Sequence, residues 1–181
     1  VLCLGIAGLL LTISCRPERN FADAGSVLFD RDTVKFDTLF RNTPSPTQRL
    51  TITNNAGENL RIDQLRIVND PDSIFSLVLN GVPGRLHDDV ELFEGDSVFA
   101  FFTMEAEVNN QHEIKEAYLE VQVGEEVQRL LLYAPVLNAI LLKDSLISQN
   151  TTLSGDTLYV INGPMVVDQG AVLTIEPGAE L

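Results

Sequence analysis

Few residues of this 181-residue chain combine types and spacings that could perform catalysis. Its two histidines, His87 and His112, lie in polar stretches and form neither H-E-x-x-H nor another zinc-binding spacing. The sequence contains no G-x-S-x-G nucleophile motif, phosphate-binding loop or dinucleotide fingerprint. We therefore expect both histidines to be hydrated loop residues, and we expect no catalytic residue and no cofactor.

Two groups of carboxylates have the spacing of possible calcium ligands. Asp70 and Asp72 form one group, and Asp88, Asp89 and Glu91 form the other. Ca²⁺ takes six to eight oxygen ligands, which closely spaced acidic side chains can supply. Neither group matches the EF-hand loop, and acidic loops are commonly just hydrated. The sequence therefore predicts no metal site.

Cys15 is the residue whose surroundings indicate a specific modification. Residues 1–14 carry no charge, and a polar stretch begins at Arg16. Fourteen residues are too few to span a bilayer, which needs about 20, but they suit the apolar core of a secretory signal. A small residue followed by cysteine at the end of this core resembles the lipobox of bacterial lipoproteins, although Thr12 departs from the usual leucine. The alternative is an ordinary signal peptide with an incidental cysteine.

The lipoprotein resemblance implies that residues 1–14 are the remnant of a signal peptide and that residues 15–26 are a lipidated tether. In that family the signal is cleaved before the cysteine, which then carries more than one acyl chain, enough for stable anchoring. The residue after the cysteine is Arg16 and not an aspartate, which is compatible with sorting to the outer membrane. The sequence does not indicate whether the protein faces the periplasm or the cell surface. Since the chain starts at Val1 and ends abruptly at Leu181, we expect it to be a piece of a longer protein.

A repeated triplet indicates a second modification. Asp, then Ser or Thr, then an aliphatic residue occurs six times, where about one occurrence is expected from the composition. The hydroxyl residues are Thr33, Thr38, Ser73, Ser97, Ser145 and Thr157. The triplet resembles the acceptor of a general O-glycosylation system that acts on exported proteins of some Gram-negative bacteria. A structural interpretation is compatible with it, because Asp-Ser/Thr favours turns and the aliphatic residue then begins a strand.

The charge of the chain excludes one class of partner. The formal net charge is −14, which argues against binding nucleic acid or an anionic membrane surface through charge. The same acidity also keeps a protein soluble.

The hydrophobic pattern is that of β-strands. Apolar residues alternate with polar ones over 50–53 and 75–79, and a turn is expected at Asn80-Gly81. The alternation slips at Gln64, which predicts a β-bulge, and the longer apolar run 98–108 suits a central strand. No sustained 3.6-residue pattern is present. Seven or eight strands separated by turn residues predict an all-β sandwich.

Several short motifs follow one another along the chain: F-D-T-L-F at 36–40, L-T-I-T-N-N at 50–55, N-L-R-I at 59–62, F-S-L at 75–77 and D-S-V-F at 96–99. Their order resembles that of the Hydin-type immunoglobulin-like domains of bacterial envelope lipoproteins. The resemblance covers residues 27–135. It implies an immunoglobulin-like β-sandwich that serves scaffolding or presentation and has no enzymatic chemistry of its own.

Near the C-terminal end, the segments 159–168 and 169–178 include a short apolar strand that is followed by the turn Pro177-Gly178. These segments resemble the start of a right-handed parallel β-helix. This resemblance implies a linker over 136–157 and the truncated first coil or coils over 158–181. A coil cannot bury its apolar face alone, and about three repeats are needed for stability. The alternative is that 158–181 forms a final hairpin packed on the sandwich.

Together these features predict an outer-membrane lipoprotein that acts as a non-catalytic binding, adhesion or presentation scaffold. Its partners would be the membrane, through the lipid on Cys15, and glycans or other envelope proteins. One alternative is the N-terminal accessory part of a polysaccharide-degrading β-helix enzyme whose catalytic residues lie beyond residue 181. Another is a purely structural periplasmic protein.

Overall fold

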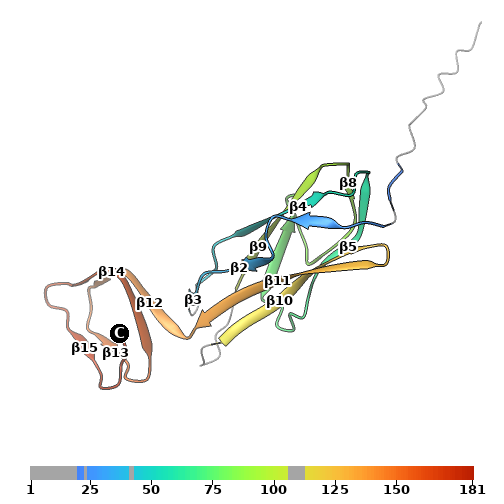
Figure 1. Cartoon of the computed structure of the whole chain (residues 1–181). Coiled ribbons are helices and arrows are strands. Elements are labelled where there is room, and N and C mark those ends of the chain that lie inside the picture. The colour runs from blue at the N-terminus through green and yellow to red at the C-terminus, as the bar shows by residue number, and fades with distance from the viewer. Residues whose placement is uncertain (1–19, 23, 41–42, 106–112) are drawn as a thin grey trace, which may run out of the picture.

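The computed structural model describes residues 20–22, 24–40, 43–105 and 113–181. These residues form strands, turns and loops, and none of them is helical (Figure 1). Consequently, no helix within this part of the chain is long and apolar enough to cross a membrane. The prediction of an all-β fold is confirmed.

The first sheet of the sandwich is antiparallel and has five strands. Their order is β1 (Val27–Phe29), β4 (Gln48–Asn54), β9 (Ser97–Met104), β6 (Phe75–Leu79) and β7 (Val82–Pro83). The apolar run predicted as a central strand forms β9, which lies between β4 and β6. Asn80 and Gly81 join β6 to β7 with φ angles of 46° and 83°, which suits a tight hairpin turn with both central residues left-handed.

The second sheet contains β2 (Thr33–Lys35), β11 (Glu126–Leu137), β10 (Glu113–Val123), β5 (Leu60–Val68) and β8 (Leu86–Leu92), in that order, and β3 (Leu39–Phe40) also pairs with β11. β2 and β3 run parallel to β11, whereas the other pairs are antiparallel. Lettered A to G along the chain, β1, β4, β5, β6, β9, β10 and β11 give the sheets A-B-E-D and G-F-C. This is the immunoglobulin arrangement, with β8 and the short strands added to it.

The two sheets bury one core between them. The alternating residues of β4, β5, β9, β10 and β11 point inward and are almost fully buried. Within this core, the rings of Phe36 and Phe75 have centroids 5.8 Å apart. Burying one such side chain contributes roughly 1.5–3 kcal/mol, so the alternation seen in the sequence is also the main source of stability.

β5 changes the face that it buries near Gln64, as the sequence pattern indicated. Its register on β8 is nevertheless the same on both sides of Asp63, because Ile62 pairs with Val90 and Gln64 pairs with Asp88. The buried face therefore changes at the same position in β5 and in its partner β8. The predicted β-bulge, which would place an extra residue in β5, is wrong for this pair of strands.

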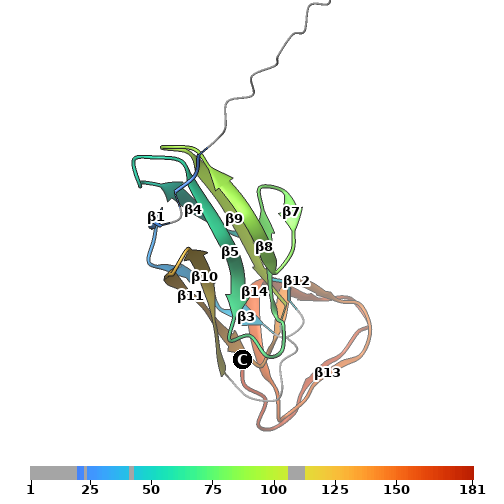
Figure 2. The same cartoon turned by 90° about the vertical axis from the view of Figure 1, so that its right-hand side faces the viewer.

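The last four strands form a separate unit beyond the sandwich (Figures 1 and 2). β12 (Ala139–Ile147) pairs in parallel with β14 (Leu158–Val167), and β13 (Thr151–Leu153) pairs in parallel with β15 (Leu173–Ile175). Leu158 pairs with Ala139 on one side and forms a parallel bridge to Glu180 on the other. The chain thus returns to the same sheet position at intervals of 19 and 22 residues.

Two expectations for the C-terminal region differ from the structure. The predicted linker, 136–157, contains the end of β11 and the strands β12 and β13, and only Asn138 separates β11 from β12. The alternative of a final hairpin is wrong, because β14 and β15 each pair in parallel with an earlier strand.

The described part of the predicted tether also differs from expectation. The backbone N–H of Ala22 donates to the carbonyl of Asn59 at 2.8 Å. The Phe21 ring lies 6.1 Å from the Phe93 ring, and the Arg61 guanidinium lies 5.0 Å from the Phe21 centroid. Residues 20–22 are therefore bound to the sandwich.

Candidate functional site

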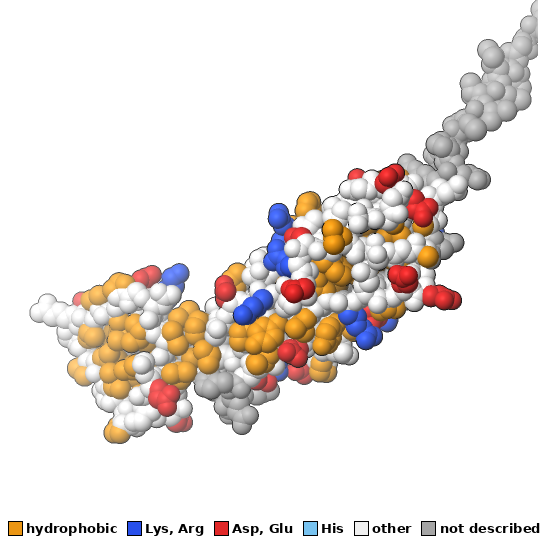
Figure 3. Space-filling model, in the orientation of Figure 1, with side chains coloured by type: hydrophobic (Ala, Val, Ile, Leu, Met, Phe, Trp, Pro, Cys, Tyr) orange, Lys and Arg blue, Asp and Glu red, His pale blue; other side chains and the backbone are white. Residues whose placement is uncertain are grey.

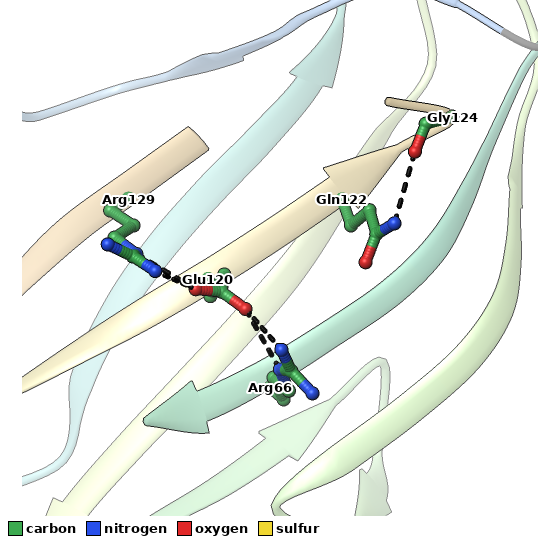
Figure 4. Close-up of polar contacts among 5 residues, drawn as sticks. All are labelled: Arg66, Glu120, Gln122, Gly124 and Arg129. Carbon is green, nitrogen blue, oxygen red and sulfur yellow. Dashed lines mark hydrogen bonds and ion pairs between the residues drawn. The ribbon is translucent and has the colours of Figure 1, made fainter. Parts of the chain in front are cut away.

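A buried carboxylate on the outer face of the second sheet is held between two arginines (Figure 4). Glu120 of β10 is only 4% exposed. Nε and Nη2 of Arg66 donate to its Oε1 at 2.9 and 2.6 Å. Nε and Nη2 of Arg129 lie 2.8 and 2.7 Å from its Oε2. Each carboxylate oxygen thus has its own guanidinium.

Strand register places these three side chains together. Leu119 and Val121 point into the core, so Glu120 points to the opposite face of β10. It is directly opposite Arg66 on β5 and Arg129 on β11. Such cross-strand neighbours have Cβ atoms about 5 Å apart, well within the reach of an arginine.

The arginines also fix the ionisation of the carboxylate. Hydrogen bonds from Arg66 and then from Arg129 lower the pKa of Glu120, against an opposing effect of burial. Glu120 is therefore a fixed negative charge at neutral pH and does not have the raised pKa of a general acid.

Glu120 and its two arginines border a shallow depression of about 460 Å³. The five residues that line this depression, which we call the Glu120 cluster, are Arg66, Glu120, Gln122, Val127 and Arg129. The arginine side chains are 43% and 60% exposed, and the Nη1 groups have no hydrogen-bond acceptor among the described residues. Gln122 donates through Nε2 to the carbonyl of Gly124 at 3.1 Å, which leaves its Oε1 open as an acceptor. The cluster offers donors for an anion and no nucleophile.

The structure describes all six hydroxyl residues of the repeated triplets. Thr38, Ser73 and Ser97 are exposed, whereas Thr33, Ser145 and Thr157 are partly buried. Leu39 and Leu158, the aliphatic residues that follow Thr38 and Thr157, are the first residues of β3 and β14, as the structural interpretation of the triplet expects. Cys15 lies outside the described residues.

His87 does not lie in a loop, contrary to expectation. It belongs to β8, is partly buried, and its Nε2 is 2.9 Å from the carbonyl oxygen of Gly84. Asp88, Asp89 and Glu91 on the same strand are exposed. His112 lies outside the described residues.

Asp70, a calcium candidate in the sequence, has a structural role. Its side chain is 2% exposed and accepts hydrogen bonds from the backbone N–H groups of Ile74 and Phe75 at 3.2 and 3.0 Å. Nη1 of Arg85 donates to it at 2.8 Å and also donates to the carbonyl of Phe75. The carboxylate is thus neutralised by an arginine. Across the part of the chain that the structure describes, no group of three or more His, Cys, Asp or Glu residues is placed to hold a metal ion.

Sequence reasoning missed Asn54, which joins the two sheets. It occupies an inward position of β4, is 1% exposed, and donates through Nδ2 to the carbonyls of Glu58, Leu92 and Phe93 at 2.7, 3.1 and 3.0 Å. Its Oδ1 accepts from the N–H of Ala56 at 2.9 Å. The available signal was an asparagine in the third inward position of an otherwise aliphatic strand.

No family model matches the chain, and no curated protein sequence matches it. Among solved structures, a protein of unknown function from Porphyromonas gingivalis W83 is similar, with 14% identity, a TM-score of 0.47, and coverage of 68% of this chain and 60% of that protein. A family 123 glycoside hydrolase from Clostridium perfringens has 9% identity, a TM-score of 0.46, and coverage of 66% of this chain and 26% of the enzyme. The ASH/PapD-like domain 7 of human CEP192 has 10% identity, a TM-score of 0.43, and coverage of 76% and 99%. The chain therefore spans less than two thirds of the first two proteins.

Proposed function

We propose that this chain is the anchored base of an outer-membrane lipoprotein, in which an immunoglobulin-like sandwich presents a right-handed parallel β-helix. The observation that carries the proposal is the parallel stacking of Ala139, Leu158 and Glu180. A solenoid is defined by such a return to the same position after each repeat. The β-helix would begin at residue 139, earlier than the sequence indicated.

The turns of the C-terminal unit support this interpretation because they stack as the strands do. Gly155 lies directly against Pro177 and Gly178, and a Cβ built on Gly178 would be 2.6 Å from the carbonyl oxygen of Gly155. Asn150 accepts through Oδ1 from the N–H of Val172 at 3.0 Å. These contacts link residues about 22 positions apart, which is the interval of the β13–β15 pairing.

Uncovered apolar side chains also support a solenoid that continues. Figure 3 shows hydrophobic side chains gathered over the C-terminal unit. The exposed large ones are Ile140, Leu146, Ile161, Val166, Val167, Val172, Ile175 and Leu181. All but Ile140 and Leu146 lie on the last coil, on which a further coil would stack and cover those that face it.

A presentation role follows from the positions of the two ends. Residues 20–22 and the unit 139–181 lie at opposite ends of the described structure (Figure 1). A lipid on Cys15 would hold the first end at the membrane, and the sandwich would then act as the spacer. The β-helix would meet glycans or envelope proteins, and the exposed Thr38, Ser73 and Ser97 would carry O-linked sugars.

The test is the intact mass and detergent partitioning of the full-length protein expressed in its native envelope. Wild type should enter the detergent phase with a mass that shows cleavage before Cys15, acyl chains and sugar-sized increments. Cys15→Ala should stay in the aqueous phase, whereas the control Cys3→Ala should behave as wild type, because Cys3 lies in the signal. Unchanged partitioning of Cys15→Ala would contradict the anchor. Cleavage of a polysaccharide by the same preparation would favour the accessory part of an enzyme instead.

A further inference from the structure

We propose that the Glu120 cluster binds a carboxylate-bearing saccharide, with Arg66 and Arg129 as its anion-binding groups. This site lies on the sandwich, so it does not depend on the lipid anchor or on the β-helix. The inference starts from the number of arginines. One guanidinium is enough to neutralise Glu120, and the second leaves the cluster with a net positive charge on a chain whose formal net charge is −14.

The cluster is arranged for an anion before any ligand arrives. Both guanidinium groups are fixed on the same carboxylate through Nε and Nη2, so little side-chain freedom remains to be lost on binding. Their Nη1 groups have no acceptor among the described residues, and both arginines line the depression. Arginine presents planar pairs of N–H donors, which match the two oxygens of a carboxylate.

The rest of the depression favours a sugar over a bare anion. The free Oε1 of Gln122 can accept a hydrogen bond from a hydroxyl group. Val127, which is 49% exposed, offers an apolar surface for the C–H face of a sugar ring. A volume of about 460 Å³ is of the size that ordinary small-molecule sites have. A uronic acid combines all three features, namely a carboxylate, hydroxyl groups and an apolar ring face.

The experiment uses digalacturonate as the probe and neutral digalactose as its matched control, each titrated into the purified full chain labelled with ¹⁵N. We expect saturable shifts of the Arg129 Nε–H and Gln122 Nε2–H signals with digalacturonate, weakened by added salt, and none with digalactose. Arg129→Gln should weaken binding at least about tenfold, since it removes a charge-assisted contact.

Two further variants separate binding from stability. Val127→Glu leaves both arginines and Glu120 in place and adds a negative charge at the rim, so it should also abolish binding. Arg49→Gln removes the same charge from the outer face of the other sheet, where Arg49 lies 5.5 Å from the Phe99 ring centroid, and should leave binding unchanged. Equal binding of digalactose, equal loss in Arg49→Gln, or no saturable shift would each overturn the proposal.

Discussion

Glu120 links the stability of the sandwich to pH. The arginines lower its pKa in the folded state, so the stabilisation is fully present above the pKa of the unfolded carboxyl and is lost as the pH falls through the folded value. We predict that Glu120→Gln lowers the free energy of unfolding by about 1–3 kcal/mol at pH 7, because two charge-assisted contacts lose their charge. The difference from wild type should shrink below about pH 4.

Urea unfolding at pH 7, 5 and 3 checks this prediction. Glu116→Gln is the matched control, because Glu116 is on the same strand and is exposed. A constant difference between Glu120→Gln and wild type across this range would show that the carboxylate is not the group responsible.

A second prediction at the residue scale concerns the contribution of Asn54 to stability. Asn54→Leu should lower the free energy of unfolding by about 2–3 kcal/mol, because the buried carbonyl of Leu92 loses its side-chain donor and the Ala56 N–H loses its acceptor. Asn54→Asp should be at least as harmful, since a carboxylate cannot donate to three carbonyls. The exposed neighbour Asn55 provides the control, and Asn55→Asp should change little. Thermal unfolding monitored by circular dichroism measures all three.

At the scale of elements, two glycines in the turns of the C-terminal unit allow a matched test of the stacking. Gly178 and Gly170 have φ angles of +93° and +90°, so alanine is strained to a similar extent at either position. Only at Gly178 would the new Cβ meet backbone, at 2.6 Å from the Gly155 oxygen. Gly178→Ala should therefore open the pairing of β13 with β15, whereas Gly170→Ala should keep it.

Amide hydrogen exchange read by mass spectrometry distinguishes these outcomes. Gly178→Ala should speed exchange over 139–181 and leave the amides of β4, β9 and β10 protected. Fast exchange to the same degree in Gly170→Ala would show that backbone strain alone, and not the stacking contact, controls the unit.

The strands of the sandwich were largely predictable because each has one buried face. Alternation marked β4 and β6, and Asn80-Gly81 marked a turn. Sequence alone could not show that Arg66 and Arg129 flank Glu120, because these residues lie 54 and 9 positions away and meet only through strand pairing. The apolar neighbours Leu119 and Val121 indicate an outward position for Glu120, but its burial comes from the two arginines.

The sequence predicts a linker where β12 forms, for a different reason. Its run Ala139–Ile147 has apolar residues on both faces, and the polar residues Lys143 and Asp144 interrupt it. In the structure this interruption is a shift of register against β14, with Asp144 at a φ of 43°. Apolar runs without alternation do not show which partner they pair with, and β12 finds its partner 19 residues later.

At the scale of the whole molecule, two units are packed separately. The core of the sandwich extends from Val27 to Val136 and contains no residue of the C-terminal unit. The buried residues Ala139, Ile147, Leu153 and Tyr159 belong to the C-terminal unit. The sandwich can therefore remain folded when the stacking of the C-terminal unit is disturbed, which is why the glycine variants are informative.

The parallel pairing of β2 and β3 with β11 has a mechanical consequence. In the proposed arrangement, a ligand pulling on the C-terminal unit would apply tension to β11 at Leu137, while a membrane anchor would hold the chain ahead of β2. Parallel strands drawn from opposite ends slide along each other, so the pairs from Thr33–Leu131 to Phe40–Leu137 are sheared together instead of opening one at a time. Single-molecule pulling from the two termini should show a higher rupture force than pulling that peels β11 from its C-terminal end, and equal forces would contradict this geometry. The sandwich would then be a joint that resists traction between the cell and whatever it holds.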